Sequence, residues 1–107
     1  MSEDTPVLDT LADMTASSIK RSHLDAREHM AVRLAALVAV DAPAASYLVN
    51  AGTAADAGVT AADVQGVLIA VAPIVGTARV VSAAGNIAKA LGIAIAVAED
   101  EDSGDAG

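Results

Sequence analysis

Cysteine, phenylalanine and tryptophan are absent from this sequence of 107 residues, and Tyr47 is its only aromatic residue. A chain without cysteine forms no disulfide, binds no metal through thiolates and performs no thiol redox chemistry. Two histidines without supporting spacing make a poor metal site, so we expect neither a metal nor another cofactor. The lack of disulfides is compatible with a reducing compartment, and we expect a cytoplasmic protein.

The scarcity of aromatic residues limits how the chain can build a core. Alanine supplies about a quarter of the sequence, and most other apolar residues are valine, leucine and isoleucine. Small side chains let helices approach closely, but each buries less area than an aromatic ring. A short chain with such a core is expected to bury further area against copies of itself, so we expect a homo-oligomer.

Basic residues are also scarce. Six lysines and arginines stand against 14 acidic residues, which gives a net charge of −8. Nucleic acids and anionic membrane surfaces require clustered basic side chains, so neither is expected as a partner. The most apolar run, residues 64–75, contains Pro73 and is too short to cross a bilayer.

Part of the negative charge lies at the C-terminal end. Five acidic residues fall within residues 99–107, among glycine and serine. Such a segment cannot bury enough apolar surface to offset the entropy of ordering. The sequence therefore predicts a folded domain over residues 1–98 and an acidic disordered tail over 99–107.

Helix signals recur along the folded part. Thr5 before Pro6 is typical of a helix start, and the apolar spacing predicts a helix through Met14, followed by a second short helix over 16–22. Asp25 and Glu28 have capping-box spacing and begin the next helix. That helix is apolar on nearly every face, which predicts a central, buried position.

Three further helices are predicted downstream. Asp41 is the expected N-cap of the first, which ends near Gly58. Thr60 begins the second, which Pro73 ends or kinks. The last opens near Thr77. No strand pattern is convincing, so the fold class is all-α, a compact bundle of about five to six helices.

Three segments carry a resemblance to a known family. Residues 32–48 read VRLAALVAVDAPAASYL, residues 57–60 and 64–68 read AGVT and VQGVL, and residues 72–81 read APIVGTARVV. Together they resemble carboxymuconolactone decarboxylase-like proteins, in a cysteine-free branch. The resemblance implies the alkylhydroperoxidase-D-like helical fold, a trimer or a multiple of it, and a pocket near a subunit interface.

Two activities are known in that family, and one is excluded here. The first is decarboxylation of a carboxylated lactone; the second is an alkylhydroperoxidase reaction at a Cys-x-x-Cys pair with a nearby glutamate and histidine. The pair is expected at the start of the helix that follows Asp41, where this chain has no sulfur. A peroxidatic step needs a thiolate and a resolving thiol, so peroxidase activity is not expected.

Glu28 and His29 are the candidate catalytic residues, because two groups of different pKa can share acid and base roles. The alternative is that Glu28 only completes the capping box and that His29 is a solvated first-turn side chain.

Arg33 and Arg79 interrupt apolar stretches and are candidate clamps for a small carboxylate ligand. The alternative is a structural ion pair with Asp41, Asp56 or Asp63. Tyr47 and Asn50 are weaker candidates for hydrogen bonding to a ligand.

Two functions follow from these residues. The slightly favoured one is a non-catalytic oligomeric scaffold or small-ligand-binding member of the family, because cysteine, a histidine cluster and aromatic pocket walls are missing. The alternative is a lyase or isomerase that acts on a small carboxylated lactone or similar acid, with Arg33 or Arg79 holding the carboxylate.

Removal of residues 99–107 tests the predicted tail. We expect assembly and melting temperature to stay nearly unchanged, since the segment has few apolar groups with which to dock. Thermal melts and light scattering of the truncated protein check this. A loss of more than about 1 kcal/mol in the free energy of unfolding would show that the segment packs on the domain.

Overall fold

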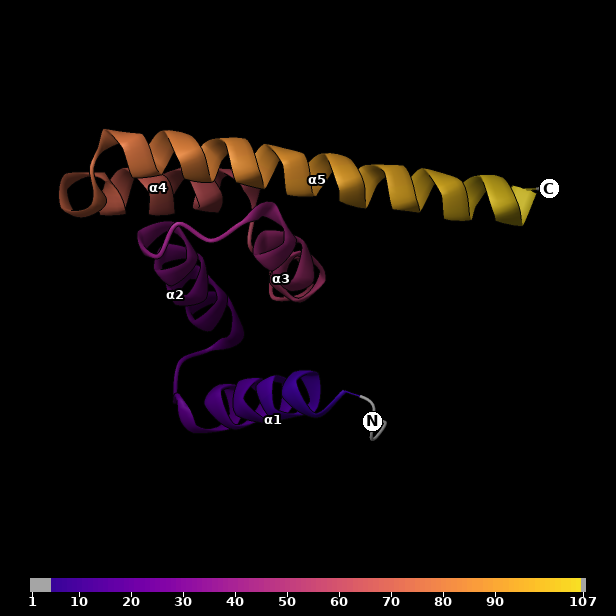
Figure 1. The fold of residues 1–107 in the computed structure, drawn as a ribbon, viewed down its shortest axis with the longest axis horizontal. Coiled ribbons are helices and arrows are strands. Elements are labelled where there is room, and N and C mark those ends of the chain that lie inside the picture. Colours follow the sequence, from indigo (N-terminus) through magenta and orange to yellow (C-terminus); the bar gives the residue numbers. More distant parts are fainter. Residues whose placement is uncertain (1–4, 107) are drawn as a thin grey trace.

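Residues 5–106 form five α-helices and no strand in the computed structural model, in which side chains are described for residues 5–92 (Figure 1). The helices are α1 (Pro6–Arg21), α2 (Ala26–Ala39), α3 (Ala44–Asp56), α4 (Ala61–Val75) and α5 (Thr77–Ala106). The all-α expectation is confirmed. None of these helices combines the length and the apolar content needed to span a bilayer.

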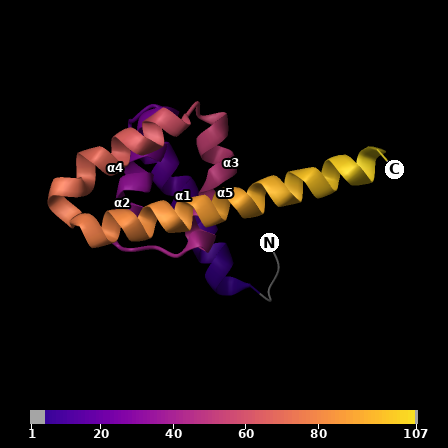
Figure 2. The same ribbon diagram turned by 90° about the horizontal axis from the view of Figure 1, so that it is seen from above.

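Helices α2 to α5 make up the body of the molecule, and α1 stands apart from it (Figure 1). The main contacts of the body join α3 with α5 and α2 with α4. A tight turn at Gly76 joins α4 to α5. Figure 2 shows the two helices as a hairpin, with α5 extending well beyond the other helices. Gly76 has a φ of +88°, a conformation that glycine adopts without strain.

The core lies between α2, α3 and α5 and consists of small side chains around one ring. Its buried members are Val38, Ala42, Tyr47, Ala83 and Ala90. Half-buried leucines, valines and an isoleucine surround them: Leu34, Leu37, Leu48, Leu68, Val71, Val75 and Ile87. The small side chains have the effect expected from the composition: Ala83 and Ala90 of α5 let α3 pack closely against that helix.

Two helix starts agree with the sequence. At α2 the Asp25 carboxylate accepts from the backbone N–H of Glu28, and the Glu28 side chain accepts from the N–H of Asp25. Thr60 and Asp63 form the same reciprocal pair at α4. The capping box predicted at Asp25 and the helix start predicted at Thr60 are both confirmed, because each depends on residues only three positions apart.

Three local expectations are wrong. The predicted break near residue 15 does not occur, since α1 is one continuous helix from Pro6 to Arg21. Helix α2 is not central and buried, because only His29, Met30 and Val38 are buried along it. The apolar side chains of α2 lie partly on a face that packs inward and partly on a face that is exposed.

The third wrong expectation concerns Asp41, which does not cap α3. Pro43 occupies the N-cap position, and Asp41 lies two residues earlier in the left-handed region, with a φ of +55°. Its carboxylate instead accepts a hydrogen bond of 2.7 Å from the Ser82 hydroxyl. Asp41 therefore links the α2–α3 turn to α5, and short polar residues tolerate its backbone conformation better than most.

The C-terminal segment predicted as a tail overlaps the end of α5. The helix continues to Ala106. Side chains from residue 93 onward lie outside the described part of the chain. The disorder expected of residues 99–107 and the domain boundary at residue 98 therefore stay predictions.

An ion pair that the sequence did not indicate joins α2 to α4. Arg27 donates two hydrogen bonds to Asp63, of 2.6 Å from Nη2 to Oδ1 and 3.1 Å from Nε to Oδ2. This bidentate geometry suits the planar guanidinium. The hydrogen bond from Arg27, followed by that from the Thr60 backbone, lowers the pKa of Asp63 to about 2.

Stability should respond to this pair at acid pH. A carboxylate with a lowered folded-state pKa stabilises the fold above the unfolded pKa of about 3.9, and its contribution is lost as the pH falls toward 2. We expect Arg27→Met to lower the urea midpoint at pH 6 and to lose this effect near pH 2. Arg21→Met, on the exposed end of α1, is the control; an equal effect of both variants at pH 6 would contradict the assignment.

Candidate functional site

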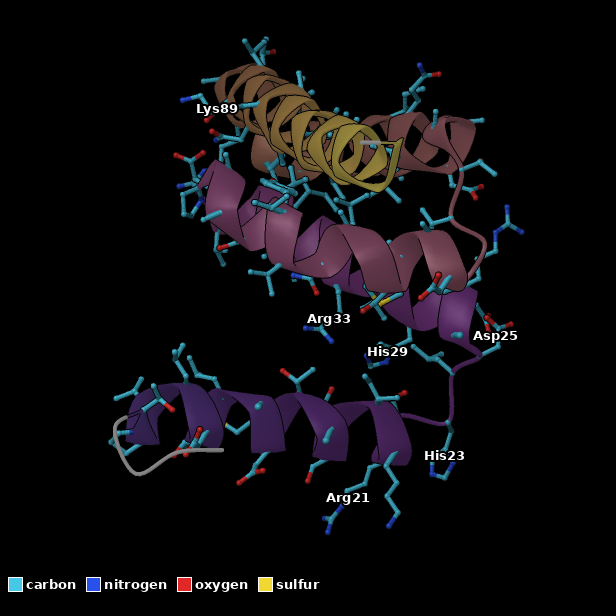
Figure 3. The ribbon with its side chains drawn as sticks, turned by 90° about the vertical axis from the view of Figure 1, so that its right-hand side faces the viewer. Arg21, His23, Asp25, His29, Arg33 and Lys89 are labelled. Atoms are coloured by element: carbon cyan, nitrogen blue, oxygen red, sulfur yellow. The ribbon has the colours of Figure 1, made fainter. Side chains whose placement is uncertain are left out.

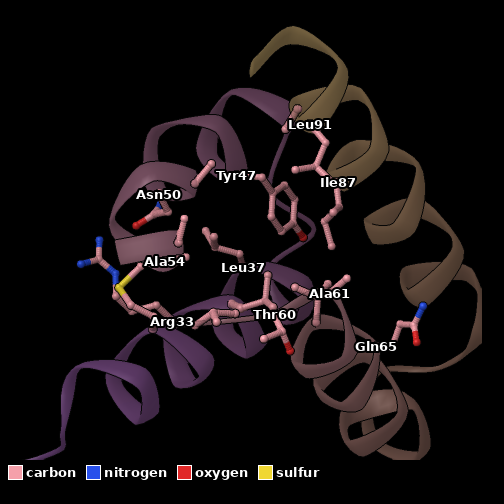
Figure 4. Close-up of a pocket in the computed structure, with 17 residues that line it drawn as sticks. Arg33, Leu37, Tyr47, Asn50, Ala54, Thr60, Ala61, Gln65, Ile87 and Leu91 are labelled. Atoms are coloured by element: carbon pink, nitrogen blue, oxygen red, sulfur yellow. The ribbon is translucent and has the colours of Figure 1, made fainter. Parts of the chain in front are cut away.

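A pocket of about 380 Å³ opens between α2, α3, α4 and α5 (Figure 4). Its wall is mostly aliphatic, with large side chains from α2, α4 and α5. These are Met30, Leu34, Leu37, Val64, Ile87 and Leu91. The α3 wall contributes Ala51, Ala54 and Ala55, whose small side chains leave the space open.

Tyr47 is the buried polar residue of this pocket. Its ring is packed in the core, with 6% of the residue exposed. Its hydroxyl is buried and has no hydrogen-bond partner among the described residues. In Figure 4 the hydroxyl points toward Ala61, inside the ring of labelled side chains. A buried hydroxyl without a partner carries a desolvation cost that a ligand can relieve.

Burial also fixes the ionisation state of Tyr47. Desolvation raises the pKa of the hydroxyl, and the negative charge of Asp41 raises it further. The phenol therefore stays protonated at neutral pH, and it can donate a hydrogen bond or accept one.

The other polar side chains of the pocket lie along its edge. The Asn50 amide donates to the Ser46 carbonyl at 2.8 Å, one turn back on α3. Thr60 lines the pocket while its hydroxyl caps α4, and Gln65 lies on the α4 side (Figure 4). The side-chain oxygen of Asn50 can still accept a hydrogen bond. The polar groups of the pocket are therefore few, and they lie apart from one another.

Arg33 borders the pocket with its half-buried side chain. The guanidinium points away from Tyr47 (Figure 4), toward the side of α2 on which α1 lies (Figure 3). It makes no hydrogen bond and no ion pair within the described part of the chain. The ion pair considered with Asp63 does not form, because Arg27 occupies that carboxylate.

Arg79 lies outside the pocket. It is exposed on α5, and its guanidinium donates a 2.8 Å hydrogen bond to the Ala39 carbonyl at the end of α2. The last carbonyls of a helix have no partner within it, so a cation there donates a hydrogen bond that they lack and interacts favourably with the helix dipole. The structure therefore does not bring Arg79 and Arg33 together as two clamps.

Glu28 and His29 do not line the pocket either. Glu28 is exposed in the capping box of α2. His29 is buried, contrary to the expectation of a solvated side chain, and its Nδ1 shares a 3.0 Å hydrogen bond with the Ser22 hydroxyl. Figure 3 shows His29 on the side of α2 that faces α1.

The pocket therefore combines an apolar body with one buried phenol and one cation at its edge. Arg33 and Tyr47 are the titratable residues among its described lining, which contains no carboxylate and no imidazole. No group of histidine and acidic side chains suited to a metal ion occurs in the described part of the chain. This arrangement suits the binding of a small molecule better than proton transfer at neutral pH.

The sequence did not indicate several pocket residues. The sequence pattern gives Thr60 only the start of a helix and singles out neither Gln65 nor the alanines of α3. One signal was present: Asn50, Ala51 and Ala54 follow Tyr47 at helical spacing, which places polar and small side chains on one face of α3.

The Tyr47 hydroxyl gives a direct test of the pocket. Tyr47→Phe removes a buried hydroxyl that has no partner among the described residues and keeps the ring. We therefore expect the free energy of unfolding to stay the same or to rise by up to about 1 kcal/mol. Tyr47→Ala also removes the ring from the core and should cost about 3–5 kcal/mol. Urea unfolding followed by circular dichroism measures both, and a loss of more than about 1 kcal/mol in Tyr47→Phe would show that the hydroxyl is hydrogen-bonded.

Comparison with known proteins assigns the fold to a family. A search of curated proteins and a search of solved structures each found no match. Residues 5–90 match the profile of the Carboxymuconolactone decarboxylase family, a range that includes α1 to α4, all the core residues named above and all pocket residues except Leu91. The chain belongs to the carboxymuconolactone decarboxylase family.

Proposed function

We propose that this family member binds a small, mainly apolar molecule in the pocket between α2, α3, α4 and α5, without transforming it. The observation that carries the proposal is the buried Tyr47 hydroxyl, which lines a mostly aliphatic cavity and has no hydrogen-bond partner among the described residues. Ligand sites commonly pair an apolar wall with a few polar groups that fix orientation.

The size of the pocket supports a small ligand. Its volume of about 380 Å³ lies at the lower end of the roughly 300–1,000 Å³ usual for such sites. Because Tyr47 stays protonated, the inner end of the ligand is expected to carry a carbonyl or hydroxyl oxygen that accepts a hydrogen bond from it. The aliphatic wall would hold the apolar body by burial alone.

Arg33 suggests what the outer end of the ligand carries. Its stem is part of the wall, and its guanidinium has no partner among the described residues. Rotation about the flexible stem would bring the cation over the pocket edge, where it would pair with a carboxylate. A small acid with an apolar body and an inner oxygen therefore fits best.

The proposal of a non-catalytic role rests on the residues that the pocket lacks. The chain has no cysteine and is therefore not a cysteine-based peroxidase. Neither Glu28 nor His29 is among the residues that line the pocket. In the described lining, only Tyr47 could move a proton, and its raised pKa keeps it protonated and a poor proton donor at neutral pH.

A lyase acting on a small carboxylated lactone is the second candidate function. Arg33 favours it, since a cation at the pocket edge without a partner among the described residues could hold a carboxylate of the substrate. That reaction would need a proton donor or acceptor near the pocket, which would have to come from outside the described lining. The binding experiment below includes a measure of turnover for this reason.

Fluorescence of Tyr47 can follow binding directly, because it is the only aromatic residue of the chain. We would titrate matched pairs of small aliphatic keto or hydroxy acids and their methyl esters, together with small carboxylated lactones. We expect the acids to bind about tenfold more tightly than the esters, which is the effect of one charge-assisted hydrogen bond.

Two arginine variants make the experiment specific. Arg33→Met should abolish the preference for the acid and leave ester binding unchanged. It should not destabilise the ligand-free protein, because no described carboxylate loses a partner. Arg79→Met is the matched control and should keep the preference. Binding to neither acid nor ester would overturn the proposal, and release of carbon dioxide from the lactones would favour the lyase.

A further inference from the structure

The first turn of α4 borders the pocket and has a backbone donor that the fold does not use. Thr60 is the N-cap, and Ala61 is the first residue of this 15-residue helix; both line the pocket. The Thr60 hydroxyl accepts from the N–H of Asp63 at 3.1 Å, and the Thr60 carbonyl accepts from that of Val64 at 3.0 Å. Within the described part of the chain, no group accepts from the N–H of Ala61. The start of α4 therefore offers a hydrogen bond to an acceptor in the pocket.

The Tyr47 hydroxyl is a second and independent donor at the same place. The residue is only 6% exposed, and its hydroxyl has no hydrogen-bond partner among the described residues. Figure 4 shows that hydroxyl directed toward Ala61. The phenol comes from α3 and the N–H from α4, so the two donors meet across the pocket. Both need an acceptor, and the dipole of α4 favours one with negative charge.

The turn between α3 and α4 holds the start of α4 against the α3 wall. Gly58 has a φ of +86°, and its N–H donates to the Ala55 carbonyl at 3.0 Å. The N–H of Val59 donates to the Ala54 carbonyl, also at 3.0 Å. Ala54, Ala55 and Val59 line the pocket. A ligand would therefore meet a donor at the start of α4 that is already in place, which limits the entropy lost on binding.

The charged side chains around the pocket leave its lining neutral or positive. Asp63, in the first turn of α4, does not line the pocket, and its carboxylate accepts two hydrogen bonds from Arg27. Asp41, whose charge raises the pKa of the Tyr47 hydroxyl, does not line it either. Helix α2 contributes the cation of Arg33, and the lining residues of α3, α4 and α5 carry no charge at neutral pH. No acidic side chain of the described lining would repel an anion.

We propose that the inner end of the pocket is an oxyanion site, at which the Tyr47 hydroxyl and the N–H of Ala61 donate hydrogen bonds to one negatively charged oxygen. This inference rests on the proposed ligand pocket and narrows its ligand to a molecule with an acidic enol or phenol oxygen, bound in the ionised form. A neutral ketone would gain less from the helix dipole and from hydrogen bonds to a charge. Such hydrogen bonds are also stronger in apolar surroundings than in water.

The small number of donors favours an enolate or a phenolate over a carboxylate at this end. Both donors can reach one oxygen, and the wall around them is mostly aliphatic. A carboxylate would place its second oxygen against that wall without a donor, which carries a desolvation cost. An enolate or phenolate has a single oxygen on an apolar body, so it suits both the donors and the wall.

The colour of para-nitrophenol can test this site, because the phenol ionises near neutral pH and only its ionised form absorbs strongly in the visible range. para-Nitroanisole has nearly the same shape and cannot ionise. We would measure the binding of both by equilibrium dialysis across the neutral pH range. We expect the ionised phenol to bind the natural chain about tenfold more tightly than the neutral phenol or the anisole, which is the effect of one charge-assisted hydrogen bond. The bound phenol should then be half ionised at about one pH unit below the free phenol.

Two variants remove the donors one at a time and keep the pocket. Tyr47→Phe removes the hydroxyl and keeps the ring. Ala61→Pro removes the N–H at the first helical position, where proline is well tolerated. Thr60 before it has a ψ of 168°, close to the extended conformation that a residue before proline prefers. Each variant should weaken binding of the ionised phenol about tenfold and change binding of the anisole less than about threefold.

Ala26→Pro is the matched control for the proline substitution. Ala26 is the first residue of α2, it does not line the pocket, and Asp25 before it has a ψ of 167°. This variant should keep the full preference for the ionised phenol. A loss of preference equal to that of Ala61→Pro would contradict the assignment of the N–H, since a proline at any helix start would then have the same effect.

The remaining outcomes separate the oxyanion site from the pocket itself. Equal binding of the phenolate and the anisole would overturn the oxyanion site and leave the pocket in place. A preference that is lost in Arg33→Met but kept in Tyr47→Phe and Ala61→Pro would also overturn it, because the anion would then lie at the pocket edge. So would para-nitrobenzoate that binds as tightly as the phenolate and is weakened by Tyr47→Phe, since the inner end would then take a carboxylate. Binding of none of the probes would overturn both this inference and the proposed function.

Discussion

The packing of the Tyr47 ring between α2, α3 and α5 is the contact on which the rest of the body depends. It is the one aromatic ring in a core otherwise made of side chains such as Val38, Ala83 and Ala90. Because the neighbours are small, the ring fills the space between helices that approach closely. The same burial leaves the hydroxyl in apolar surroundings and raises its pKa. Tyr47 therefore belongs to both the core and the pocket, as Ala90 does.

Small residues have two opposite consequences in this fold. Ala83 and Ala90 let α5 pack closely on α3 and close the core. Ala51 and Ala54, on the pocket side of α3, fill so little volume that a cavity remains. The lack of large aromatic residues thus accounts for both the tight helix contact and the pocket. It also accounts for the modest extent of the core, which leaves apolar faces on α1 and α2 uncovered.

The helices and their starts could largely be predicted from the sequence, because these features depend on nearby residues. The capping boxes at Asp25 and Thr60 involve side chains and backbone groups within one turn. The wrong N-cap assignment at Asp41 arose because a distant contact competes with the local one. Asp41 has the side chain of an N-cap, yet Ser82 of α5 holds its carboxylate and Pro43 takes the cap position.

The sequence by itself determined the all-helical class, the family and the absence of thiol chemistry, because composition, local spacing and motif order suffice for each. Only the tertiary structure decided which candidate residues meet. Arg33 and Arg79 look alike in sequence, but one borders the pocket and the other binds the end of α2. Arg27 and Asp63 form an ion pair across 36 positions. Such pairings depend on the angles and positions at which helices cross, and the spacing of residues within one helix does not predict that geometry.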